Sequence, residues 1–157
     1  MKRAIFLAAV AALAAGCSSG QSRSNDETFS REVEDKVREA DARAGESRTL
    51  SALSKLEEAL AAYIAAERKI PDKLEELMPR YLADIPPLEL DVRGHRDTNA
   101  VQVYPPSILR DGQIDGTRLK DTGRWGYTHN DRQVVVFIDC THQSKRGHAW
   151  YKQKGVY

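Results

Sequence analysis

The stretch that decides the fold is residues 50–71, which read LSALSKLEEALAAYIAAERKIP. Apolar residues return here every three or four positions, which predicts an amphipathic helix with one apolar face. That face is formed by Leu53, Leu56, Leu60, Tyr63 and Ile64. We expect this face to pack against the core of the protein. The helix should end near Lys69, because the residue before Pro71 disfavours helical geometry.

Upstream of this helix, residues 29–44 carry a thin apolar stripe at helical spacing among many charged residues. Its members are Phe29, Val33, Val37 and Ala40. Gly45 separates the two patterns, and we expect it to interrupt the helix because glycine costs about 1 kcal/mol relative to alanine in a helix.

Downstream of Pro71, the sequence predicts a short second helix that runs to Met78 and stops at Pro79. Asp72 is the expected N-cap of this helix, within a capping box. The side chains expected to dock the segment onto the first helix are Tyr81, Leu82 and Ile85.

The pattern changes after Pro86-Pro87, where strand signals replace helical periodicity. We expect strands in the stretches with alternation or β-branched runs, which are residues 88–92, 101–104 and 133–140. A turn at 144–147 should return residues 148–154 as an antiparallel partner, and residues 105–124 should be loop. Helix first and strands second predict an α+β fold, with the helix packed on a small antiparallel sheet.

The N-terminus has the pattern of an export signal. Lys2 and Arg3 precede an apolar stretch from Ala4 to Ala15, and small residues then lead to Cys17. This run resembles a lipobox, although Ala14 stands where leucine is usual. The resemblance implies cleavage before Cys17 and a lipid on its sulfur. The alternatives are an ordinary secretory signal and a retained membrane helix, for which the apolar stretch is too short.

These signals divide the chain into a signal peptide at 1–16, a lipidated cysteine with a flexible tether at 17–28, and an α+β domain at 29–157. The tether is expected to be flexible because its small polar residues offer little apolar surface to bury. Two or three acyl chains would anchor the protein stably. We expect an envelope protein that faces the periplasm, and Ser18 after the cysteine favours the outer membrane.

The charge and cysteine content narrow the function classes. Loss of the leader removes Lys2 and Arg3 and leaves 22 basic and 23 acidic residues, a net charge of −1. This balance gives no electrostatic case for nucleic acid as a partner. Lipidation of Cys17 would leave Cys140 as the one thiol, so an internal disulfide is not expected.

Residues 46–152 resemble type IV pilins and type II secretion pseudopilins. The resemblance rests on the segment Ile70-Pro71 to Ile85-Pro86 after the helix, on Asp121 to Tyr127, and on Val136 to His142. It implies a pilin-like head, with the helix packed on a C-terminal sheet. The chain has no prepilin peptidase site and no apolar assembly helix, and a lipobox and a polar tether stand in their place.

Two metal sites come into question. His129, Cys140 and His142, with His148 nearby, carry zinc-ligand chemistry. The expected pairing across the turn 144–147 places His142 and His148 on opposite faces, which argues against zinc and leaves Cys140 as an inert buried thiol.

The family resemblance suggests a second candidate, a calcium site, because the major pseudopilins bind calcium in a loop of the C-terminal region. The oxygen ligands in the corresponding region here are Asp111, Asp115 and Asp121. Asp-Gly pairs are also ordinary turn formers, so no cofactor is expected and calcium stays open as the alternative.

No catalytic motif of a hydrolase or a phosphate-binding enzyme occurs in the sequence. The sequence therefore predicts a non-enzymatic envelope lipoprotein with a pilin-like domain that acts as a structural or protein-interaction module. Its expected partners are the membrane and envelope proteins, among them secretion or pilus components. The alternative is a periplasmic module that binds a small ligand or a metal.

Overall fold

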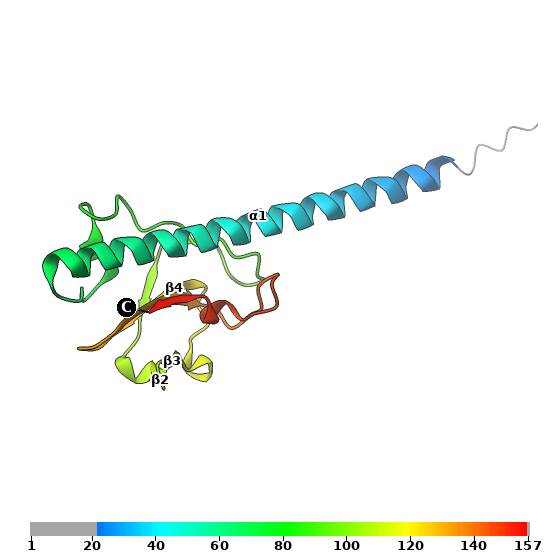
Figure 1. The fold of residues 1–157 in the computed structure, drawn as a ribbon. Coiled ribbons are helices and arrows are strands. Elements are labelled where there is room, and N and C mark those ends of the chain that lie inside the picture. The colour runs from blue at the N-terminus through cyan, green and yellow to red at the C-terminus, as the bar shows by residue number, and fades with distance from the viewer. Residues whose placement is uncertain (1–21, 157) are drawn as a thin grey trace, which may run out of the picture. The chain divides into compact units, whose positions relative to one another are not determined.

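The computed structural model describes residues 22–156, with side chains from 27 to 153. The described chain divides into two units, one ending at Val37 and one beginning at Arg38. The expected signal peptide and Cys17 lie outside the described residues. A single long helix, α1 (Ser22–Glu67), begins inside the stretch 17–28, where the sequence predicts a flexible tether (Figure 1).

The expected interruption at Gly45 is wrong, because α1 is continuous through that residue. Tertiary contacts on the following turn outweigh the small cost of one glycine. Glu46 is buried, and its Oε2 accepts the backbone N–H of Lys145 at 2.8 Å. Thr49 is fully buried and bonds to the backbone of Glu89.

The end of the helix agrees with the sequence. After Glu67, Arg68 takes a left-handed conformation with φ of 56°, and the chain leaves the helix ahead of Pro71. The short second helix is a 3-10 helix, η1 (Leu74–Leu77). Its N-cap is Lys73 rather than the expected Asp72. The side chain of Glu76 accepts hydrogen bonds from the backbone N–H groups of both Asp72 and Lys73.

The docking residues after η1 are confirmed. Ile85 is buried in the core, and Tyr81 and Leu82 pack partly buried against it. Tyr81 also lies edge-on to Tyr63 with ring centroids 5.4 Å apart, and its hydroxyl donates to Glu67 at 2.6 Å. These contacts fix the segment after α1 onto the end of the helix.

The main sheet confirms the α+β class but is mixed rather than antiparallel. Its strands are β1 (Val101–Val103), β4 (Arg124–His129), β5 (Val134–Asp139) and β6 (Lys154–Val156), in the order β1-β4-β5-β6. β1 pairs with β4 in parallel, and the other two pairings are antiparallel. The expected strands at 101–104 and 133–140 are therefore confirmed, with slightly shorter bounds.

The segment between β1 and β4 is not the plain loop expected at 105–124. It forms the 3-10 helix η2 (Pro106–Ile108), a two-stranded sheet of β2 (Leu109–Arg110) and β3 (Gln113–Ile114), and the 3-10 helix η3 (Gly116–Arg118). This crossover lets β1 and β4 run in parallel.

The strand expected at 88–92 is wrong, and the one expected at 148–154 starts later than predicted. Residues 88–92 make only an isolated bridge from Leu88 to Thr98. The Thr49 hydroxyl forms hydrogen bonds with both the N–H and the carbonyl of Glu89. In a strand, these groups would pair with a neighbouring strand instead. The chain after the turn 144–147 does return as an antiparallel partner of β5, but this partner is β6, which begins only at Lys154. Before it, a bridge from Gln143 to Ala149 is followed by the 3-10 helix η4 (Trp150–Lys152).

β5 is buried on both faces, and it divides the core into two layers. Its alternate residues Val134, Val136 and Ile138, with Cys140 beyond the strand, join the cluster that contains Leu56 and Leu60 of α1. The other residues, Val135 and Phe137, join a second cluster over β2 and β3. Figure 1 shows the part of α1 after Val37 and these two short strands on opposite sides of the sheet.

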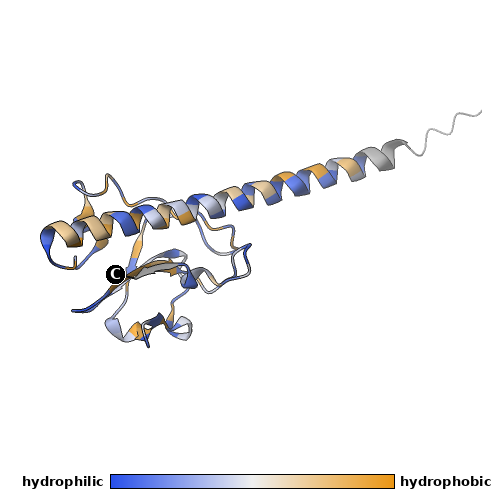
Figure 2. Ribbon diagram, viewed as in Figure 1, coloured by the Kyte–Doolittle hydropathy of each residue, from blue (hydrophilic) through white to orange (hydrophobic). Residues whose placement is uncertain are grey.

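Figure 2 shows apolar and polar residues mixed along α1. Within residues 22–156, no helix combines the length and the apolar character needed to cross a membrane.

Candidate functional site

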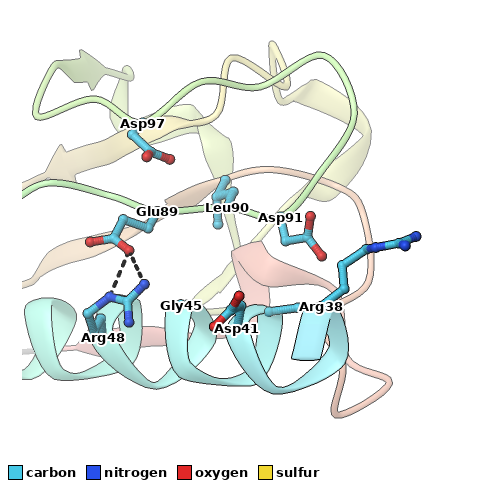
Figure 3. A pocket seen from close by; sticks show the side chains of 9 residues that line it. Arg38, Asp41, Gly45, Arg48, Glu89, Leu90, Asp91 and Asp97 are labelled. Atoms are coloured by element: carbon cyan, nitrogen blue, oxygen red, sulfur yellow. Dashed lines mark hydrogen bonds and ion pairs between the residues drawn. The ribbon is translucent and has the colours of Figure 1, made fainter. Parts of the chain in front are cut away.

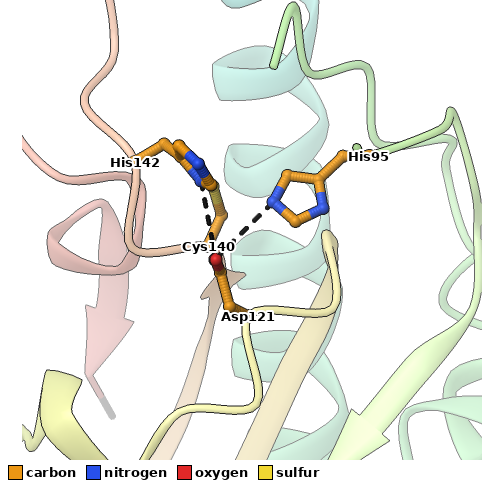
Figure 4. Close-up of side chains that lie close together, drawn as sticks. All are labelled: His95, Asp121, Cys140 and His142. Carbon is orange, nitrogen blue, oxygen red and sulfur yellow. Dashed lines mark hydrogen bonds and ion pairs between the residues drawn. The ribbon is translucent and has the colours of Figure 1, made fainter. Parts of the chain in front are cut away.

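Four side chains with metal-ligand chemistry converge where the end of β5 meets two loops (Figure 4). They are His95, Asp121, Cys140 and His142. One ligand atom from each lies within 4.8 Å of the others. His95 comes from the loop closed by the bridge between Leu88 and Thr98, Asp121 from the loop before β4, and the other two from the chain after β5.

The distances inside this cluster are short. The Sγ of Cys140 lies 3.5 Å from the Nδ1 of His142, and that nitrogen lies 3.6 Å from the Oδ2 of Asp121. The Nε2 of His95 lies 3.6 Å from the Oδ1 of Asp121. The two imidazole rings meet edge to face with centroids 5.3 Å apart. Both rings therefore turn a nitrogen toward one carboxylate.

A buried carboxylate behind the cluster sets the position of Asp121. Asp139 is fully buried at the end of β5, and its side chain accepts the backbone N–H groups of Asp121 and Thr122, each at 3.2 Å. The carbonyl of Asp139 accepts the N–H of Gly123 at 2.9 Å. The tight loop that results has left-handed residues at Asp121 and Gly123, with φ of 54° and 66°.

His95 is the most enclosed histidine of the cluster. Its side chain is 7% exposed, and its Nε2 is buried with no hydrogen-bond partner. The ring packs against the backbone of Gly123, where an added Cβ would lie 2.6 Å from the Cγ of His95. Glycine is thus required at 123 by both its φ and this close approach.

Burial and neighbouring groups shift two of the cluster's acids in opposite directions. Burial raises the pKa of the Cys140 thiol to about 11. Burial also opposes ionisation of Asp121, but the Thr141 N–H and the imidazoles of His142 and His95 outweigh it, and the pKa of this carboxyl lies below its ordinary value. A thiol that stays protonated at neutral pH is a poor nucleophile.

The structure brings together only two of the three residues of the expected zinc set. Cys140 and His142 are neighbours, but His129 lies elsewhere, with its Nε2 4.0 Å from the Oδ1 of Asp72 and its ring against Tyr127. His148 is exposed and stands outside the cluster. The confirmed part of the prediction is that Cys140 is buried.

The expected calcium set is also divided. Asp121 belongs to the cluster, whereas Asp115 accepts the backbone N–H and the hydroxyl of Thr117 at 3.1 and 2.6 Å. Asp111 stands at the turn between β2 and β3, with φ of 51°. Among the residues whose side chains are described, the cluster with His95 is the one group of three or more potential ligands that converges.

Sequence reasoning missed His95 and the role of Asp121 beside it. The stretch Asp121-Thr122-Gly123 and the spacing Cys140-Thr141-His142 are visible signals, because a left-handed loop and a Cys-x-His pair both suggest a built site. His95 carries no such signal, since it reaches the cluster only through the fold.

A second feature is a hollow between α1 and the segment 89–97, shown in Figure 3. Acidic and basic side chains are among those that line it. The guanidinium of Arg48 binds the Oε2 of Glu89 through its Nε at 2.8 Å and its Nη2 at 2.7 Å. These contacts fasten the segment to the helix.

A third feature is an apolar stripe on α1, defined here as Phe29, Val33 and Val37. All residues from 27 to 41 are exposed. The stripe's side chains are 66%, 44% and 54% exposed, respectively, which is unusual for residues of this size on one helix face.

Comparison with known proteins identifies no relative. No family model, no curated protein and no solved structure matches the chain.

Proposed function

We propose that this chain is a lipid-anchored envelope protein whose pilin-like domain acts as a non-enzymatic protein-interaction module. The observation that carries the proposal is the exposed apolar stripe of Phe29, Val33 and Val37 on α1. The pattern ending at Cys17 supports the lipid anchor. The stripe would then follow the anchor within a short stretch of chain, at the membrane face.

The exposed segment of α1 has the character of a partner surface. An isolated helix of this length is marginal in water, and most helical stability comes from burying one face. From 27 to 41 the segment buries no face, although it carries three large apolar side chains in line. Ion pairs such as Glu39 with Arg43 at 2.6 Å support it only weakly, because both side chains are well exposed.

The resemblance to pilins supports the choice of partner class. The chain places a long helix before a small sheet, and the C-terminal part of that helix covers one sheet face. In pilins the N-terminal part of the helix carries the assembly contacts. Here a lipid on Cys17 would hold the head at the membrane, so we propose an envelope partner such as a secretion or pilus component.

The anchor is tested by growing cells with a clickable palmitate analogue and fractionating the envelope. We expect label on the wild-type chain and its recovery with the membrane. Cys17→Ser should lose both the label and the membrane fraction, and Cys140→Ser should keep them. Equal labelling of the wild type and Cys17→Ser would overturn the lipid anchor.

The interaction surface is tested with a photo-crosslinking amino acid at Val33 in intact cells. Position 31 lies about 160° around the helix from position 33 and serves as the matched control. We expect a discrete crosslinked envelope protein from position 33 and none from position 31. The product should disappear with Phe29→Ser and Val37→Ser. No product from position 33, or equal products from both positions, would contradict the proposal.

A further inference from the structure

We propose that His95, Asp121, Cys140 and His142 form a binding site for zinc or a closely similar divalent transition metal ion. The site lies at the end of β5 and is separate from the apolar stripe on α1, so it does not depend on the proposed interaction function. Its argument rests on the spacing of the donor atoms, on their chemistry, and on an unpartnered buried nitrogen.

The spacing fits a tetrahedral ion. Zinc bonds of about 2.0 to 2.3 Å place neighbouring donors of a tetrahedron about 3.3 to 3.8 Å apart. The sulfur of Cys140 lies 3.5 Å from the Nδ1 of His142, and that nitrogen lies 3.6 Å from Asp121. The Nε2 of His95 is also 3.6 Å from Asp121. Three donor separations thus already match those around a bound ion, and all four donors lie within 4.8 Å of one another.

The donor chemistry selects the class of metal. Two imidazoles, one thiolate and one carboxylate are ligands that zinc accepts, whereas calcium and magnesium take oxygen ligands. The thiolate and carboxylate together carry two negative charges, which match a divalent cation. Four protein donors fill a tetrahedral shell, as in structural rather than catalytic zinc sites.

Groups around the cluster hold the donors in place. The Thr141 N–H donates to the Oδ1 of Asp121 at 2.7 Å and leaves Oδ2 beside His142. Asp139 fixes the loop that carries Asp121. Such outer hydrogen bonds orient ligands in metal proteins.

The unpartnered nitrogen of His95 is the second, independent sign of a ligand. Its side chain is more than nine-tenths buried, its Nε2 has no hydrogen-bond partner, and that atom faces the other donors (Figure 4). A buried polar atom without a partner costs about 1 to 3 kcal/mol, and native proteins rarely leave one. A metal ion would supply the missing partner.

Metal binding would join three segments of the chain. The Cys140 sulfur forms a bond to the ion, and its proton passes to water. No oxidant or reductant is involved. The ion would then tie the loop at His95 and the loop at Asp121 to the end of β5, which makes it a structural staple for the loop-rich side of the sheet.

The test is a zinc titration of the full chain carrying Cys17→Ser, in competition with a chromophoric chelator. We expect one zinc per chain. Cys140→Ser and His95→Asn should each weaken binding more than about 100-fold, beyond the effect of losing an outer-shell partner. His129→Asn is the matched control for a histidine outside the cluster and should leave the affinity unchanged.

Two measurements on the chain with His95, Asp121, Cys140 and His142 intact decide the matter even where a variant fails to fold. Cobalt should give thiolate-to-metal charge-transfer absorption, which zinc removes. Zinc should also slow the labelling of Cys140 by a thiol reagent, and a chelator should restore the rate. Absence of stoichiometric zinc binding, or binding that survives His95→Asn and Cys140→Ser unchanged, would overturn the site.

Discussion

The hydroxyl of Thr49 holds the backbone of Glu89 through two hydrogen bonds, donating to its carbonyl at 2.6 Å and accepting its N–H at 3.1 Å. Thr49 lies in the middle of α1 and is fully buried. Because Thr49 pairs with both the N–H and the carbonyl of Glu89, the segment after Pro87 is attached to the helix without belonging to a sheet.

The first prediction removes this clamp. Thr49→Val keeps the shape of the side chain but leaves a buried N–H and a carbonyl of Glu89 without partners. We expect the free energy of unfolding to fall by about 1 to 3 kcal/mol, measured by urea denaturation. Ser51→Val is the control, because Ser51 is exposed on the same helix. Equal stability of the two variants would show that the hydroxyl contributes nothing.

The same clamp explains where sequence reasoning succeeds and fails. The helix over 50–67 is predictable because its apolar period is local, and Leu56 and Leu60 are indeed fully buried. Residues 88–92 alternate like a strand, but Thr49 of α1 forms hydrogen bonds with both backbone groups of Glu89. The local sequence pattern does not reveal this contact. A competing long-range contact thus overrides a local signal.

The candidate metal site shows the same limit. Cys140 and His142 stand two positions apart and are recognisable as a pair, whereas His95 joins them only through tertiary contacts. The parallel pairing of β1 with β4 is equally non-local, because it depends on the crossover that carries β2 and β3. Spacing in sequence cannot report contacts that arise only from the folded path of the chain.

The second prediction concerns Gly45 in the interior of α1. An added Cβ at this position would meet only the Nη2 of Arg48, at an ordinary 3.8 Å. We therefore expect Gly45→Ala to raise the free energy of unfolding by about 1 kcal/mol through helix propensity. Thermal and urea unfolding would measure the change.

Gly126→Ala is the matched contrast, because its Cβ would lie 2.3 Å from the Cζ of Phe137. We expect it to lower the free energy of unfolding by about 1 to 3 kcal/mol through overpacking. If both alanine variants change stability in the same direction, contact distance does not govern these two sites.

The third prediction concerns the reactivity of Cys140 in the metal-free chain. Burial raises the pKa of this thiol to about 11, against an ordinary value of 9.0. At pH 8 the thiolate fraction should be about 100-fold lower than for an ordinary thiol, and steric burial should slow the reaction further. We expect slow labelling by a disulfide reagent in Cys17→Ser with chelator present, at a rate that rises up to about pH 11.

The denatured chain serves as the control for this measurement and should label at the rate of an ordinary thiol. Labelling of the native chain as fast as the denatured one would contradict the burial of Cys140.

The fourth prediction concerns stability at alkaline pH. Tyr127 is fully buried, its hydroxyl donates to the carbonyl of Pro71, and burial raises its pKa above the ordinary value of 10.0. Below pH 10 both the native and the unfolded states keep the phenolic proton, so this group adds no pH dependence. Above that pH the unfolded chain loses the proton first and binds fewer protons, so the free energy of unfolding falls as pH rises.

Tyr127→Phe separates this effect from other titrating groups. At neutral pH the variant should lose about 1 kcal/mol with the hydrogen bond to Pro71. From about pH 10 upward its stability should decline less steeply than that of the wild type, because the phenol that favours the protonated native state is gone. Urea denaturation at successive pH values measures both slopes, and parallel curves for the wild type and Tyr127→Phe would rule out Tyr127 as a source of the alkaline loss.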